Sequence, residues 1–340
     1  MKKLVFIKLL IFVTLLLGCG TSTSKKTKDI DIFVGIEGLT AEFAKSAPPP
    51  RVFESMNFPS RFPILLSIRN KGAYSIAQDG LRGLLSIGSE KDYVPKIKFE
   101  TNGKVLNGDK ENEIYFFVDG KSNLNTKGEE IIVTAIAEAG KLDPQSEYRK
   151  TTITANLCYP YKTVLSATVC IDPDVGGIRP GKKVCNVKEL VFNNGQGAPI
   201  AVTKIEPQMI PEGNNIKPQF LIFIENKGKG TPVDISNYVH ACRQSDASKT
   251  NIWNVAFLNV YTSGKENQLD CTPGEASILK GTGFIRFRDK KDFVKCTFKK
   301  ETREIKRTDD AYTSPLRIEI DYGYVQTVAT TFTIQKPLKY

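Results

Sequence analysis

Short runs in which apolar and polar residues alternate recur along most of this chain. Examples are residues 30–34, 63–68, 96–99, 113–118 and 131–136. A period of two places alternate side chains on opposite faces of a strand. Glycine, asparagine, aspartate and proline separate the runs at intervals typical of β-sandwiches rather than of alternating strands and helices. Helical spacing is limited to residues 74–84 and 234–243, so the pattern predicts an all-β fold.

One pattern of residues occurs twice. Residues 64–72 and 220–228 both read as a hydrophobic strand that ends in Asn-Lys-Gly. Asparagine and glycine accept the left-handed backbone that a tight turn or bulge requires. Each copy is later followed by a threonine-rich closing strand, at residues 151–155 and 330–334. The repeat predicts two similar β modules in tandem.

The predicted modules have definite bounds. The first covers residues 29–157 and the second residues 185–337, with a cysteine-containing linker at residues 158–184 between them. The second module carries an insertion around residues 242–307. A mature chain of this length is more than a single core usually serves, which also favours two domains.

The start of the chain has a different pattern. Lysines precede an apolar run at residues 4–17, which leads into Leu-Leu-Gly-Cys at residues 16–19. The run is shorter than the ~20 apolar residues of a spanning helix and is typical of a signal peptide, here residues 1–18. Leu-Leu-Gly-Cys resembles the lipobox of prokaryotic lipoproteins. That resemblance implies cleavage before Cys19 and lipid on its sulfur.

The lipidated cysteine would begin a tether, residues 19–28, that is polar and rich in lysine. Its lipid would make the membrane a partner and would hold the protein on the outer side of the cell membrane. An ordinary signal peptide followed by a chance cysteine is the alternative. Both interpretations predict an exported protein.

Six further cysteines all lie beyond residue 157: Cys158, Cys170, Cys185, Cys242, Cys271 and Cys296. An even number in an exported chain predicts up to three disulfides, for which 15 pairings exist. Glycines and a proline between Cys170 and Cys185 allow the chain to reverse, so this pair is the first candidate. Zinc is the alternative, but the chain has no C-x-x-C and one histidine. We expect no metal and no cofactor.

Net charge favours acidic partners. The formal charge is +11, and loss of three lysines with the signal peptide leaves +8. Such a balance suits anionic envelope polymers or lipid head groups, and another surface protein is a further candidate partner. Export and the lack of a recognition motif argue against nucleic acid.

Positive charge is densest at residues 286–307, where ten cations face four acidic residues for a local balance of +6. Alternation at residues 284–288 and 294–299 predicts a hairpin with apolar residues on one side and cations on the other. We consider it either an anionic-surface contact or a solvated face. The candidate contact residues are Arg286, Arg288, Lys290, Lys291, Lys295, Lys299 and Lys300.

Catalytic patterns are weak. His240 is the single histidine, so any Ser-His-Asp or Cys-His arrangement would need it. It lies beside Cys242 and reads as a structural or surface residue. Residues 228–231 are superficially similar to a phosphate loop, but Phe223 stands where the first glycine belongs, which favours a turn.

Two further features allow alternatives. Asp172 and Asp174 lie in a glycine-rich turn, where they could serve a calcium site or act as the paired carboxylates of a hydrolase. Turn formation explains them more simply. Trp253 is either a core anchor or a platform for stacking a sugar, and we favour the core.

Two resemblances add to this reading. A strand followed by Asn-x-Gly resembles the immunoglobulin-like, cell-adhesion-related domains of prokaryotic surface proteins. Residues 157–206, which include Cys158, Cys170 and Cys185, are similar to exported proteins of small-genome archaea that have no assigned activity. We therefore expect two immunoglobulin-like β-sandwiches in a non-catalytic surface lipoprotein that acts in adhesion, binding or envelope scaffolding. The alternative is an envelope hydrolase that uses Asp172 and Asp174.

Overall fold

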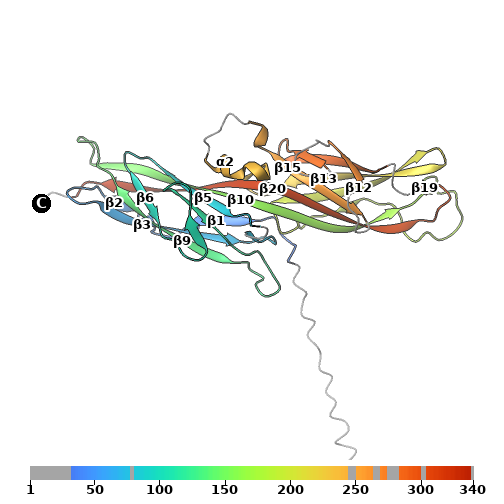
Figure 1. The fold of residues 1–340 in the computed structure, drawn as a ribbon, viewed down its shortest axis with the longest axis horizontal. Coiled ribbons are helices and arrows are strands. Elements are labelled where there is room, and N and C mark those ends of the chain that lie inside the picture. Colours follow the sequence, from blue (N-terminus) through green and yellow to red (C-terminus); the bar gives the residue numbers. More distant parts are fainter. Residues whose placement is uncertain are drawn as a thin grey trace, which may run out of the picture. The chain divides into compact units, whose positions relative to one another are not determined.

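Strands dominate this protein (Figure 1). A computed structural model describes residues 32–76, 80–243, 250–262, 269–273, 283–299 and 304–337. From Ile32 onward the chain clusters as one compact unit. The strands within these described ranges form three sheets, which confirms the predicted all-β class.

The first sheet is antiparallel and contains four strands. In sheet order these are β1 (Leu39–Phe43), β3 (Ser60–Asn70), β9 (Glu130–Ala139) and β6 (Lys96–Phe99). Alternate residues of β3 are buried, including Phe62, Ile64, Leu66 and Ile68. The sequence pattern therefore identified the inward face of this strand.

The second sheet has nine strands and contains the closing strands of both repeats. Its main path is β17 (Gly283–Arg286), β15 (Val255–Thr262), β20 (Tyr312–Gln335), β10 (Tyr148–Ile171), β5 (Gly83–Ser89), β8 (Glu113–Phe116) and β7 (Val105–Asn107). Two short strands, β2 (Arg51–Phe53) and β14 (Thr231–Val233), also pair with β20.

The third sheet has six strands. They are β11 (Leu190–Val191), β12 (Ile200–Glu212), β13 (Asn215–Asn226), β18 (Lys291–Phe298), β16 (Leu269–Thr272) and, beside β13, β19 (Ile305–Lys306). Strand β13 alternates buried and half-buried residues along its full length. It corresponds to β3 in the sequence repeat.

Helical segments are short. A 3-10 turn η1 (Ile235–Asn237), capped by Asp234, leads into α2 (Tyr238–Arg243), and a second turn is η2 (Thr250–Ile252). The helix predicted at residues 234–243 is thus confirmed. The one predicted at residues 74–84 is wrong in its described part, because Ile76 bridges to Val118 and β5 begins at Gly83.

Strands β10 and β20 pair antiparallel over all 24 residues of each, from Tyr148 opposite Gln335 to Ile171 opposite Tyr312. The predicted linker therefore differs from the structure at residues 158–171, which continue β10. Alternate residues stay buried past Cys158 because the third sheet covers this part of the strand. For example, Thr163 Oγ1 donates to the Ile200 carbonyl at 2.7 Å.

Four buried tyrosines occupy the middle of the paired strands. Tyr159 lies opposite Tyr324, and Tyr161 lies opposite Tyr322. Their rings form a continuous set of tilted and edge contacts, with centroids 5.5–6.3 Å apart. We call these four residues the tyrosine cluster. The main hydrophobic core contains all four, together with residues of every sheet.

Candidate functional site

The predicted basic residues lie where the chain passes between two sheets. Strand β17 ends at Arg286 in the nine-stranded sheet, and β18 begins at Lys291 in the six-stranded sheet. Asp289 and Lys290 between them have φ angles of 48° and 67°, and Arg288 bridges to Lys291. Positive φ at both central residues indicates a tight type I′ turn. We call residues 286–295 the basic corner.

The predicted hairpin is limited to its turn, where Arg288 and Lys291 pair with each other, and the pairing does not continue between β17 and β18. Strand β17 pairs with β15, whereas β18 pairs with β13 and β16. Ile285 and Val294 are both fully buried, but they enter the core from different sheets. Alternation of apolar and polar residues identifies the inward face of a strand but not the strand with which it pairs. The sequence pattern alone therefore could not show that β17 and β18 belong to different sheets.

Five of the candidate contact residues are exposed at the corner: Arg286, Arg288, Lys290, Lys291 and Lys295. Phe287 and Val294 between them are buried, as the alternation predicted, whereas Phe293 is 51% exposed. Lys299 is half-buried, and its Nζ lies 3.7 Å from Asp270 Oδ1. Lys300 lies outside the described residues.

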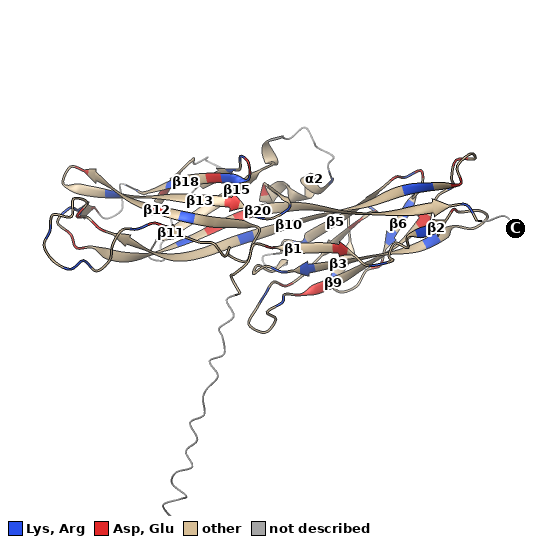
Figure 2. Cartoon of the chain, turned by 180° about the vertical axis from the view of Figure 1, so that it is seen from behind, with Lys and Arg blue, Asp and Glu red and all other residues tan. Residues whose placement is uncertain are grey.

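Acidic residues compensate the corner only in part. Asp292 Oδ2 accepts from the Arg286 backbone N–H at 2.9 Å, and Lys291 Nζ lies 4.0 Å from Glu225 Oε1. The Lys291 side chain is 71% exposed, and such surface pairs contribute only about 0–1 kcal/mol. Figure 2 shows cationic residues on several other strands too. The corner differs from those strands because five cations lie within ten residues of sequence.

The two turn carboxylates are held by one lysine. Lys183 Nζ lies 2.6 Å from Asp172 Oδ2 and 3.1 Å from Asp174 Oδ2. Desolvation opposes ionisation of Asp174, but backbone N–H groups of Ile178 and Arg179 and the lysine lower its pKa to about 2. A general acid needs a raised pKa, so this arrangement suits a structural turn better than acid catalysis.

A cavity of about 330 Å³ lies beside this turn, lined by Asp172, Asp174, Arg179, Lys183 and Asp310 among others. The Arg179 guanidinium donates to the carbonyls of Thr308 and Asp309 at 3.0 and 2.8 Å. Asp172, Asp174, Arg179 and Lys183 in the lining of this cavity are thus already engaged within the protein. Among the residues that the structure describes, no group of three or more His, Cys, Asp or Glu side chains is arranged to hold a metal ion.

All six predicted disulfide cysteines are paired. Cys170 bonds to Cys185, the pair that the sequence favoured first. Cys271 bonds to Cys296 between β16 and β18, and Cys158 bonds to Cys242 between β10 and α2. Three disulfides are typical of an exported protein.

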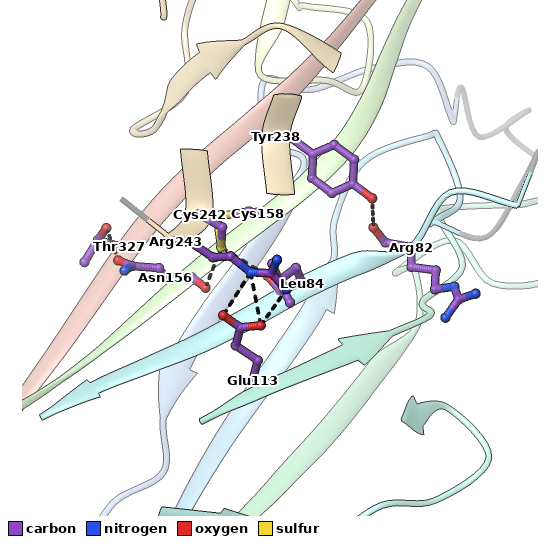
Figure 3. Close-up of a disulfide and its surroundings, with 9 residues drawn as sticks. All are labelled: Arg82, Leu84, Glu113, Asn156, Cys158, Tyr238, Cys242, Arg243 and Thr327. Carbon is purple, nitrogen blue, oxygen red and sulfur yellow. Dashed lines mark hydrogen bonds and ion pairs between the residues drawn. A yellow bond between two sulfur atoms is a disulfide. The ribbon is translucent and has the colours of Figure 1, made fainter. Parts of the chain in front are cut away.

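Helix α2 belongs to the second repeat but is fastened to strands of the first (Figure 3). Arg243 Nη2 lies 2.8 Å from Glu113 Oε2 and 2.6 Å from Asp109 Oδ2, and the Tyr238 hydroxyl donates to the Arg82 carbonyl at 2.7 Å. The Glu113 side chain is 1% exposed. The disulfide at Cys242 completes these contacts, which we call the α2 clamp.

Sequence reasoning missed the α2 clamp. Glu113 and Arg243 are separated by 130 residues, and each sits in an ordinary local pattern. A carboxylate at the start of an apolar strand was the one available signal, because such a group needs a partner when buried.

The remaining single residues take structural positions. His240 is exposed on α2, and residues 228–230 form the predicted turn between β13 and β14. Trp253 is half-buried and packs on the small hydrophobic cluster beneath α2. It therefore anchors α2 rather than the centre of a sandwich.

The predicted leader, Cys19 and the tether lie outside the described residues. Within the described ranges, no helix combines the length and apolar character needed to cross a membrane.

Comparisons with known proteins are sparse. No family model matches the chain, and no curated protein matches it. Among solved structures, the C-terminal domain of the Streptococcus agalactiae AgI/II polypeptide BspA is 8% identical, with 88% of this chain and 100% of that chain covered and a TM-score of 0.16. The C-terminal domain of the Streptococcus pyogenes antigen I/II-family protein AspA is 10% identical, with 89% and 100% covered and a TM-score of 0.18. Likenesses at these scores carry no argument about fold or function, and none of the matches supports the similarity to archaeal proteins.

Proposed function

We propose that this protein is a non-catalytic surface lipoprotein, lipidated at Cys19, that binds external material as an adhesion or envelope-scaffold module. Two immunoglobulin-like repeats would form its body. In each repeat, part of the nine-stranded sheet would pack against one of the two smaller sheets. Three disulfides and the sequence of the leader support export. The engaged carboxylates and the exposed histidine support a role without catalysis.

The basic corner is the observation that carries the binding proposal. Five exposed cations project from one tight turn and its flanking strands, while Phe287 and Val294 between them are buried. Such a surface attracts carboxylate, phosphate or sulfate groups, and the attraction weakens with salt because the Debye length falls from ~10 Å at 0.1 M to ~3 Å at 1 M. We propose an anionic envelope polymer as the partner.

Binding of residues 20–340 to an acidic polysaccharide tests this proposal. We expect affinity to fall steeply between 0.1 and 1 M salt, and to fall again when Arg288, Lys290, Lys291 and Lys295 are changed to Glu. The matched control changes Lys91, Lys96, Lys98 and Lys150 to Glu, which are exposed on other parts of the protein and give the same net charge. Equal binding by both variants would show that the corner is only a solvated face.

The second candidate is the envelope hydrolase with Asp172 and Asp174 as its carboxylates. A turnover screen on envelope polysaccharides distinguishes it from the binding module. Activity that is lost in Asp172→Asn, while the protein remains folded, would favour the hydrolase.

A further inference from the structure

Large apolar side chains are exposed together at one end of the nine-stranded sheet. Phe53 is 51%, Met56 61% and Phe58 84% exposed. Tyr148, which is 70% exposed, begins β10 at the same sheet end, because Phe53 and Tyr148 both pair with Gln335. Scattered exposed apolar residues are normal, but a contiguous group marks an interaction site. We call Phe53, Met56, Phe58 and Tyr148 the apolar tip.

The loop that carries Met56 and Phe58 is fixed at its base. The Glu54 N–H donates to the Gln335 carbonyl at 3.0 Å, and Glu54 Oε2 accepts from the Leu142 N–H at 2.9 Å. On the other side, the Ser60 N–H donates to Ser55 Oγ at 2.8 Å. These bonds hold the apolar side chains outward, so the exposure belongs to an ordered loop.

A hollow of about 600 Å³ with a mainly apolar lining adjoins the loop, between Phe53, Phe58 and Pro337. Arg51 on β2 and Arg61 on β3 are exposed on the two strands that this loop joins, and Arg61 Nε also donates to Glu138 Oε1 at 3.2 Å. Aromatic and thioether groups flanked by arginines match the interface of a bilayer, where rings lie at the head groups and guanidinium groups reach phosphates.

We propose that the apolar tip inserts into the interface of a lipid bilayer. The inference rests on the proposed lipid anchoring in one respect, which is that Cys19 would hold the protein at a membrane. Insertion would give the anchored protein a second, non-covalent membrane contact and would fix which side of it faces the membrane.

Chain lengths allow both contacts at once. Leu39, near the start of the described chain, donates its N–H to the Tyr159 hydroxyl at 3.3 Å, so the chain enters beside the middle of β10. From Tyr159 to Tyr148 the strand extends roughly 36 Å at ~3.3 Å per residue. Residues 20–31 can span up to about 40 Å when extended.

Lipid at Cys19 would strengthen insertion of the tip. A tethered second contact acts at a high effective concentration, because the anchor keeps the tip near the bilayer. Because apolar insertion depends little on charge, it should survive high salt and should not need anionic lipid.

Flotation of residues 20–340, which contain the whole compact unit, with phosphatidylcholine vesicles at 0.1 and 1 M salt tests the proposal. We expect binding at both salt concentrations. Changing Phe53, Met56 and Phe58 to Ser should weaken it about tenfold or more, since the three side chains would no longer transfer apolar surface from water into the bilayer. Phe293→Ser is the matched control, because Phe293 is also 51% exposed but lies on β18, and it should bind normally.

A second measurement uses Phe58→Trp, whose emission should shift to the blue when vesicles are added. Equal flotation of the triple variant and the parent, or an unshifted emission, would overturn the proposal. So would concentration-dependent dimerisation that the triple variant abolishes without vesicle binding, because the tip would then bind a second copy. The four-site variant of the basic corner should bind neutral vesicles normally, so failure of the polymer proposal and failure of this one are distinguishable.

Discussion

The Tyr161 hydroxyl on β10 donates to Asn70 Oδ1 at 3.0 Å, and both residues are fully buried. Tyr324 on β20 makes the same 3.0 Å bond to Asn226. Each asparagine also accepts from the glycine of its own Asn-Lys-Gly turn. The repeated sequence thus encodes one repeated junction between a turn and a closing strand.

Loss of this junction should destabilise the fold. Asn70→Ala removes an acceptor for Tyr161 and Gly72 and a donor to the Tyr74 carbonyl. Leaving buried groups unsatisfied costs about 1–3 kcal/mol. Urea unfolding should show at least that loss, while Tyr161→Phe should lose about 1 kcal/mol, the net value of one hydrogen bond, because Asn70 keeps its other bonds. A neutral Asn70→Ala would contradict the junction's role.

Alkaline pH should unfold the protein through the tyrosine cluster. Burial raises the pKa of Tyr159 and Tyr322 well above the usual value and that of Tyr324 to about 12. Unfolded tyrosines lose their protons near pH 10. The stability linked to these groups is therefore full below pH ~10 and falls as pH rises through 10 toward 12. Circular dichroism and phenolate absorbance should change together in that range.

The α2 clamp predicts a large effect of one arginine. Arg243→Ala removes the guanidinium from the buried carboxylate of Glu113 and leaves it with Lys110 Nζ at 4.0 Å, and breaking a buried pair costs about 3–5 kcal/mol. The double variant with Glu113→Gln should recover part of this loss. Thermal unfolding of both variants checks the coupling, and losses that simply add would show that the two groups act independently.

Acid should loosen the loop that Lys183 fastens. Because the pKa of Asp174 is lowered to about 2, its contribution is present above the unfolded value near pH 4 and is lost as pH falls toward 2. Protection of the Ile178 and Arg179 N–H groups against hydrogen exchange, relative to an unstructured chain at the same pH, should fall over that range, because both groups bond to this carboxylate. Asp174→Asn should show fast exchange already at neutral pH.

The lipid anchor predicts a processing defect. Cys19→Ser should abolish incorporation of labelled lipid and leave the precursor uncut when the chain is expressed in a prokaryotic host. Normal processing and membrane association of this variant would refute lipidation at Cys19.

The sequence predicted strands better than their partners. Period-two alternation identified β3, β13 and the buried faces of β17 and β18, because burial of one strand face is a local property. Pairing between β10 and β20 depends on residues more than 140 positions apart, and the partner of Glu113 on α2 is similarly remote. The pair of Cys170 and Cys185 was predictable because only a short loop separates them.

Continuity of β10 and β20 has a mechanical consequence. Tandem modules usually move about the linker between them, but here two 24-residue strands run through both repeats in one uninterrupted ladder. Bending the repeats against each other would require many of its hydrogen bonds to break together. A force applied at the basic corner would therefore be transmitted to the other repeat along β10 and β20. The two repeats would rotate together as one rigid body.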